Sequence, residues 1–249
     1  MQQSSDAFGK ALLDWVDGGT TPEIVERDDG VIEIGAGAEV YLMEFDEWPS
    51  AEQQSMHFVR GRVVDLGCGG GRVALHLQTL GCQVVGVDAS PLAIRAARLY
   101  GVKKTACLTV EQLGSRIDDF DTIILFGNNL GVFGTPARAT TVLTRWAKKL
   151  PSGTRILVES TNPLSGGAPV IDRAYCERNR KKGVALGQCR LRVWYDRSPS
   201  VWFNWFFASR TELKRLVRGT GWSMVHVVTG APDEPYVAVL EIVSPTARQ

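Results

Sequence analysis

The stretch VVDLGCGGGR, residues 63–72, joins an apolar run to a glycine-rich turn and then to the start of a helical pattern. Glycine admits positive φ angles and lets a ligand approach the backbone, because no Cβ stands in the way. The helix that follows directs its first N–H groups toward the turn. In open α/β sheets, ligands bind outside the carboxyl ends of the strands. The stretch therefore predicts a ligand site at the end of this strand.

Strands and helices alternate along the chain after residue 62. The expected strands are RVVDL, QVVGVD, a short one near TACLTV, FDTIILF and TRILVES, and the expected helices cover 71–80, 91–100 and 136–149. Continuous apolar strands between helices are typical of a parallel sheet that is covered on both faces. A further helix at 209–219 precedes SMVHVV and YVAVLEIV, which are close enough in sequence to pair as a hairpin. These features predict an α/β fold with a doubly wound, mostly parallel sheet.

Two segments stand outside this alternation. Residues 6–18 have helical spacing, and residues 24–43 look extended with a hairpin turn at DDG. We therefore expect a helical and hairpin cap over residues 1–60 and the main domain over 61–249. Within the main domain, QCRLRVWY and VWFNWFF predict a β-hairpin that is inserted at about 163–208.

The composition excludes several classes of protein. The 249-residue chain has a formal charge of +1, so no overall field steers it toward nucleic acid. It has no apolar run of about 18 residues, and MQQSSDAFGK does not have the pattern of a signal peptide. Five scattered cysteines suit a reducing cytoplasm, and none stands at zinc-ligand spacing with the three histidines. We expect a cytoplasmic protein without a metal site or a membrane span.

The acids around the glycine turn indicate which ligand it binds. A dinucleotide fingerprint, G-x-G-x-x-G, fits poorly, because its third glycine falls on Arg72 or Ala74. The pattern is D-x-G-x-G-x-G, and Asp65 would repel a pyrophosphate but attract an amino group or a sulfonium. Asp88 ends the second strand, where a carboxylate can bind both hydroxyls of a ribose.

With VDLGCGGGR followed by VVGVDAS, the chain resembles the class I S-adenosylmethionine-dependent methyltransferases. The resemblance implies a seven-stranded sheet with an antiparallel C-terminal strand, S-adenosylmethionine as cofactor and S-adenosylhomocysteine as product. It implies that Asp65 and the Gly67–Gly71 loop hold the methionine end, Asp88 the ribose, and Ala89 the adenine. Relatives carry an acid that contacts the adenine after the third strand, but this chain has CLTVEQL there, so we assign that contact to the Val110 backbone. The cofactor residues implied in this way are Asp65, Gly67, Cys68, Gly69, Asp88, Ala89 and Val110.

Methyl transfer needs alignment and removal of a proton, so no obligatory catalytic motif is expected. Asn128 and Asn129 follow the fourth strand, where they could bind the cofactor's amino acid end, orient an acceptor or satisfy the loop backbone. Glu159 ends the fifth strand as a candidate general base, or as an ion-pair partner, and Asn162 lies near it. Our candidates for acceptor handling are Glu159, Asn129 and His57, with Asn162 as a substrate contact.

Two of the candidates come from before the first strand. His57 could reach over the cofactor, although a lone histidine on a helix is more often an ordinary surface or core residue. Tyr41 could cap the cofactor or simply pack.

The inserted segment is strongly basic. Residues 173–197 hold eight Lys or Arg and two acids, a local charge of +6, which leaves −5 for the rest of the chain. This asymmetry suits an anionic acceptor or RNA, or only a solvated face of the hairpin. We expect the aromatic hairpin to roof the acceptor pocket, with Tyr195 and Trp205 as contacts.

These observations favour methyl transfer to a small acceptor that is aromatic or anionic, such as a secondary metabolite. One alternative is a methyltransferase acting on RNA or protein, and another is a cofactor-binding partner module without catalysis. A dinucleotide oxidoreductase is the weakest rival. A homodimer is compatible with the sequence, and nucleic acid is a less favoured partner than a small molecule.

Overall fold

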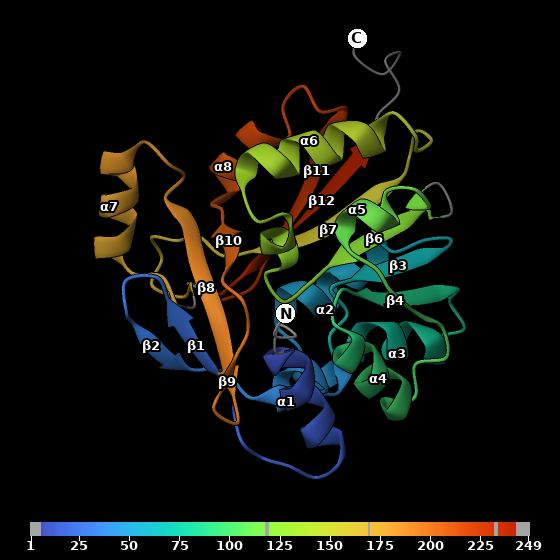
Figure 1. The fold of residues 1–249 in the computed structure, drawn as a ribbon. Coiled ribbons are helices and arrows are strands. Elements are labelled where there is room, and N and C mark those ends of the chain that lie inside the picture. The colour runs from blue at the N-terminus through green and yellow to red at the C-terminus, as the bar shows by residue number, and fades with distance from the viewer. Residues whose placement is uncertain (1–5, 118–119, 169, 232–233, 243–249) are drawn as a thin grey trace.

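The computed structural model describes residues 6–117, 120–168, 170–231 and 234–242 and contains two sheets (Figure 1). The larger sheet has seven strands in the order β11-β12-β7-β6-β3-β4-β5. Neighbouring strands from β7 to β5 run parallel, whereas β12 is antiparallel to both β7 and β11. This confirms the expected mostly parallel sheet and its antiparallel C-terminal hairpin. The strands are β3 (Val63–Leu66), β4 (Val84–Asp88), β5 (Thr105–Cys107), β6 (Thr122–Leu125), β7 (Arg155–Ser160), β11 (Trp222–Thr229) and β12 (Tyr236–Ile242).

Helices cover both faces of this sheet. Successive residues of a strand point to opposite faces, so the continuously apolar strands place buried side chains on both. Ile123 and Leu125 of β6 pack with α5, α6 and α8, whereas Ile124 packs with α2, α3 and α4. The sheet is thus doubly wound, as expected. The helices are α2 (Ser50–Ser55), α3 (Arg72–Thr79), α4 (Pro91–Tyr100), α5 (Val110–Leu113), α6 (Pro136–Ala147) and α8 (Arg210–Leu216).

The second sheet joins the two segments that stand outside the alternation. Its strand order is β10-β8-β1-β2, with the short β9 paired to β8. Central β1 pairs with β8 antiparallel, so that Val25 lies opposite Val193. The expected N-terminal hairpin and the expected inserted hairpin therefore lie side by side in one sheet. The strands are β1 (Ile24–Arg27), β2 (Ile32–Ile34), β8 (Gly187–Tyr195), β9 (Ser198–Pro199) and β10 (Phe203–Phe207).

Part of the basic insertion is helical rather than extended. Helix α7 (Arg173–Lys182) begins at the N-cap Asp172, whose side chain accepts a hydrogen bond from the Tyr175 N–H. It ends at Gly183, which takes the left-handed conformation that glycine favours at this position. The expectation of a simple hairpin over 163–208 is therefore wrong for this part of the insertion.

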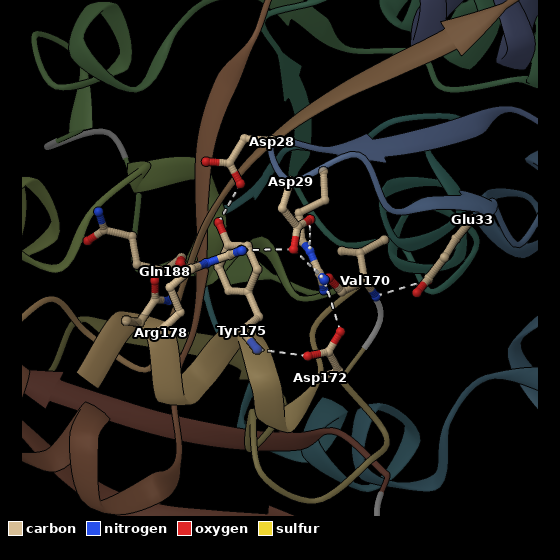
Figure 2. Close-up of polar contacts among 10 residues, drawn as sticks. Asp28, Asp29, Glu33, Val170, Asp172, Tyr175, Arg178 and Gln188 are labelled. Carbon is tan, nitrogen blue, oxygen red and sulfur yellow. Dashed lines mark hydrogen bonds and ion pairs between the residues drawn. The ribbon is translucent and has the colours of Figure 1, made fainter. Parts of the chain in front are cut away.

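The buried Arg27 connects the N-terminal hairpin to α7. Figure 2 shows two of its acidic partners, Asp29 and Asp172. Arg27 of β1 donates to Asp29 (2.7 Å), to Asp172 (2.9 Å) and to the carbonyl oxygen of Val170 (2.8 Å). Its guanidinium also lies over the ring of Tyr175. All three guanidinium nitrogens therefore have acceptors, and the network fixes the second sheet to the segment that follows β7.

The remaining N-terminal residues pack between the two sheets. Helix α1 (Ala7–Val16) forms where helical spacing predicts it, with Asp6 as its N-cap. It packs against α4 and against Val193 and Tyr195 of β8. The segment 38–43 is not extended as expected but contains a 3₁₀ turn. The 3₁₀ turns before β3 are η1 (Ala38–Tyr41), η2 (Phe45–Glu47) and η3 (Met56–Phe58).

Candidate active site

The glycine turn lies at the carboxyl end of β3, in the middle of the larger sheet. Gly67, Gly69 and Gly71 have φ angles of +75°, +52° and +91°, which side chains rarely adopt. A Cβ at Gly67 would lie 2.5 Å from Nδ2 of Asn129, and one at Gly70 would lie 2.5 Å from Leu42. Close packing within the protein is therefore one reason for the missing side chains, next to the approach of a ligand.

The two acids predicted beside the turn are both held by backbone N–H groups. Asp65 is buried, and its Oδ2 accepts from the Ala74 N–H of α3 (3.2 Å). Burial raises the pKa of Asp65 to about 7, partly opposed by Arg72. Asp88 accepts from the N–H groups of Gly69 (3.0 Å) and Ser90 (2.9 Å), and burial raises its pKa against these hydrogen bonds. Asp88 thus connects the glycine turn to the start of α4.

The loop after β6 is fixed by side chains from neighbouring strands. Each carboxyl oxygen of Glu159 accepts one N–H, from Gly127 and from Asn128, at 3.0 Å. Asn128 has a φ of +60°, and its Oδ1 accepts from the Thr161 hydroxyl. The Asn129 amide donates to the carbonyls of the glycine turn, at Leu66 (3.2 Å) and Gly67 (2.8 Å). The predicted Glu159, Asn128 and Asn129 therefore lie together and lock this loop to the glycine turn. The 3₁₀ helix η5 (Asn129–Phe133) continues the loop.

A buried ion pair at this site was not anticipated from the sequence. Arg72, the first residue of α3, donates to both oxygens of Glu52 of α2, at 2.6 and 2.8 Å. Its guanidinium also lies over the Trp48 ring. Burial and the neighbouring Glu52 raise the pKa of Glu159 well above its usual range. A single Glu in SAEQQS carries no periodic signal, so only the three-dimensional structure reveals this pair.

N-terminal residues cover the glycine turn. Leu12 and Phe8 of α1 are the nearest side chains to the space that a Cβ of Gly69 would fill. Tyr41 packs edge-on against Phe8, with ring centroids 5.0 Å apart, and its carbonyl oxygen faces Gly70. The structure thus brings Tyr41 to the site, as its proposed capping role requires.

The other residues expected at the cofactor lie along the same sheet edge. Cys68 is buried against Gly86 of β4, and Ala89 is exposed directly after Asp88. Val110 is the first residue of α5, and its side chain packs in the core. Its backbone contact with an adenine stays a prediction.

On the acceptor side, Trp205 of β10 packs against η5, because a Cβ at Gly131 would overlap its ring. Phe203, Asn204 and Trp205 line a cavity of about 230 Å³ together with residues 131–135 and Arg138. Asn162 is exposed, and its Oδ1 accepts from the Leu164 N–H.

The structure separates two predicted residues from this site. His57 lies on η3 against the Phe58 ring, and the Phe58 carbonyl accepts from Arg155, the first residue of β7. That is the amino edge of the parallel sheet, opposite to the glycine turn, so the catalytic assignment of His57 is abandoned. Tyr195 is buried under α1, with Lys10 over its ring, and not beside Trp205. Because it packs under α1 and does not line the cavity beside Trp205, its assignment as a substrate contact is abandoned.

The site fits a ligand with cationic groups. Three buried carboxyl groups, those of Glu52, Asp65 and Glu159, act on Arg72, whose side chain is 10% exposed. A surplus of buried carboxyls is costly unless positive charge or protons balance it. Among the described residues, no group of three or more His, Cys, Asp or Glu is arranged to hold a metal ion. In the same part of the chain, no helix has the length and apolarity that a membrane crossing needs.

Comparison with known proteins agrees with this picture. A family model described as a methyltransferase domain matches residues 22–227. The ubiquinone biosynthesis O-methyltransferase of Cereibacter sphaeroides is 29% identical over 148 residues, 57% of this chain and 57% of that protein. The enzyme of the same name from Chelativorans sp. is 31% identical over 130 residues, 49% and 50% of the two chains. This chain thus spans about half the length of these curated relatives.

A solved S-adenosylmethionine-dependent methyltransferase from Bacteroides fragilis, in complex with S-adenosylhomocysteine, has the same fold. The TM-score is 0.78 and the sequence identity 21%, over 96% of this chain and 95% of the other. Because the family match spans most of the chain and the fold agrees with it, the chain belongs to the class I S-adenosylmethionine-dependent methyltransferases.

Proposed function

We propose that this enzyme methylates a small aromatic molecule that binds under the second sheet, beside the loop after β6. The observation that carries the proposal is the cavity of about 230 Å³ lined by Phe203, Trp205 and the backbone of residues 131–135. Aromatic walls with few polar groups are typical of small-molecule sites. Two curated relatives are named as methyltransferases of ubiquinone biosynthesis, which supports a small acceptor.

The charges at the cavity favour an uncharged acceptor over an anionic one. Arg138 is the basic residue among the cavity lining, and it is paired with Glu111. Three of the eight basic residues of 173–197 also have acidic partners: Arg178 with Asp29, Arg180 with Glu177, and Arg192 with Glu26. Part of the local positive charge is thus balanced within the protein, which weakens the case for RNA as the acceptor.

The cofactor, when bound, supplies a methyl group on positively charged sulfur that an acceptor can displace. This chain's residues would hold and orient the reactants. The glycine turn, Asp65 and Asp88 would hold the cofactor, and Asn129 keeps the turn in register with the loop after β6. Glu159 already accepts two backbone N–H groups, so we assign it to positioning that loop rather than to removing the acceptor's proton. The cytoplasmic location and a homodimer remain predictions.

The test is methylation of a panel of phenols, catechols and aromatic amines, with product detected by mass spectrometry. We expect at least one methylated product, and Trp205→Leu should lower kcat/KM for it about tenfold or more through lost aromatic packing. Trp202→Leu is the matched control, because Trp202 stacks with Arg190 and Arg192 instead of lining the cavity.

Two outcomes would contradict the proposal. One is salt-sensitive methylation of RNA without any small-molecule product. The other is cofactor binding without turnover on any acceptor, which would favour a non-catalytic module.

A further inference from the structure

Glu23, which directly precedes β1, is a buried acid that has no role in the site described above. Its exposed fraction is 3%, and within the described chain its Oε2 has no hydrogen-bond partner. Burial raises the pKa of its carboxyl group, and the backbone N–H groups of Glu23 and Gly37 partly oppose this shift. A buried carboxyl oxygen without a partner is costly, so such a group calls for a donor or a cation.

The position of Glu23 connects it to the glycine turn. Its carboxyl group lies against Gly35, where a Cβ would overlap it, in the glycine-rich segment that leads to Tyr41. The Glu23 charge acts on the Tyr41 hydroxyl, whose pKa is raised first by burial and then by this acid. The Tyr41 carbonyl in turn faces Gly70. Arg72, the first residue of α3, acts on the same hydroxyl, so we place Glu23 in the N-terminal cover of the turn, on the side of Arg72.

Each of the other carboxyl groups near the turn accepts at least one hydrogen bond within the protein, whereas Oε2 of Glu23 accepts none among the described residues. Both oxygens of Glu52 accept from Arg72, and both oxygens of Glu159 accept backbone N–H groups. Asp65 accepts from the Ala74 N–H. The carbonyls of Leu66 and Gly67 accept from the Asn129 amide and have a second lone pair each, so they could share the ammonium group with Glu23.

We propose that Glu23 is the carboxylate that receives the α-ammonium group at the amino acid end of S-adenosylmethionine. An ammonium group offers three donors and a positive charge, which is what a buried carboxyl oxygen without a partner lacks. The inference depends on the cofactor alone and not on the acceptor, so it stands or falls separately from the proposed function.

The experiment is a four-part cycle measured by calorimetry. Wild type and Glu23→Gln are each titrated with S-adenosylhomocysteine and with its analogue in which hydrogen replaces the α-amino group. We expect the wild type to prefer the amino-containing ligand by about tenfold or more, and Glu23→Gln to reduce this preference below about threefold. Glu26→Gln is the matched control, since Glu26 lies three residues further along, in β1, but pairs with Arg192 and Trp194. Its preference should equal that of the wild type.

An undiminished preference in Glu23→Gln would overturn the assignment. Equal weakening of both ligands would also overturn it, because Glu23 would then act only on the fold of the N-terminal cover. Should Glu23→Gln fail to fold, Glu23→Asp is tested instead, because it keeps the charge on a shorter side chain. Its preference for the amino-containing ligand over the deaminated analogue should then be smaller than that of the wild type, and an unchanged preference would overturn the assignment.

Discussion

On the cofactor side and in the second sheet, an arginine is paired with carboxylates, but the two arginines differ in what surrounds them. Arg72 is held by Glu52, whose side chain is 1% exposed, and lies among the strands that carry the glycine turn. Arg27 is held by Asp29 and Asp172, whose side chains are 21% and 53% exposed. The acids around Arg72 cannot reach water if the arginine is lost, whereas those around Arg27 can.

This difference shows how the two halves of the site are built. The cofactor side is a closed set of charges that must stay balanced among themselves or with a cationic ligand. The second sheet is fastened at its outer end by a network that water can partly replace (Figure 2). We therefore expect changes on the cofactor side to affect folding and cofactor binding strongly, and changes in the second sheet to affect mainly the acceptor.

The largest effect is expected from Arg72→Met. It leaves Glu52 buried without its cation, which should lower the free energy of unfolding by about 3–5 kcal/mol. Urea denaturation measures the change. The double variant Arg72→Met/Glu52→Leu removes both charges and should recover most of the loss. If the double variant is as unstable as the single one, packing of Arg72 on Trp48 matters more than its charge.

Gly67→Ala should weaken S-adenosylhomocysteine binding by about 2–3 kcal/mol, because it adds strain at positive φ and displaces the Asn129 amide. Calorimetry measures the affinity. Gly81→Ala is the matched control, since Gly81 has a φ of +79° and no atom within 4 Å of the added Cβ. Gly81→Ala should cost stability only. Equal losses of affinity in the two variants would mean that backbone strain alone, and not the contact with Asn129, explains the effect.

The cofactor side was also the more predictable half. Its strand, glycine turn and helix are contiguous in sequence, and Asp88 follows one crossover later, so local patterns suffice. The same holds for Asn128, Asn129 and Glu159 at neighbouring strand ends. What they bind was harder to foresee, because Asn129 and Glu159 use their polar atoms on backbone groups within the protein.

The second sheet could not be assembled from sequence, because β1 and β8 are far apart along the chain and no local signal sets their pairing. Helix α7 was missed because RAYCERNRKK buries only Tyr175, Cys176 and Asn179 and lacks an apolar stripe. His57 was misplaced for a different reason. A residue shortly before the first strand lies at the amino edge of the sheet, while the ligand site lies at the carboxyl edge.

A smaller effect is expected from Arg27→Met in the second sheet. The acids it leaves behind are partly hydrated, so the free energy of unfolding should fall by only about 1–2 kcal/mol. S-adenosylhomocysteine affinity should stay within about threefold of the wild type, because the variant leaves the glycine turn intact. Urea denaturation and calorimetry test both statements. A large loss of cofactor affinity would show that the second sheet also shapes the cofactor side, and the distinction between the two halves would not hold.

The smallest effect concerns protons on the cofactor side. The pKa of Asp65 is raised from 3.8 to about 7 in the folded protein, so the folded state binds a proton more tightly than the unfolded state. Its contribution to stability is therefore complete below the unfolded pKa and is lost as the pH rises through about 7. Between about pH 6 and pH 8 the ligand-free protein should lose about 1 kcal/mol on this account. Urea denaturation at both values measures the loss, and Asp65→Asn should abolish it. A cationic cofactor favours the ionised carboxylate, so binding near neutral pH should release part of a proton, which calorimetry in buffers of different ionisation enthalpy detects. An unchanged pH dependence in Asp65→Asn would mean that another of the buried acids, such as Glu159, holds the proton instead.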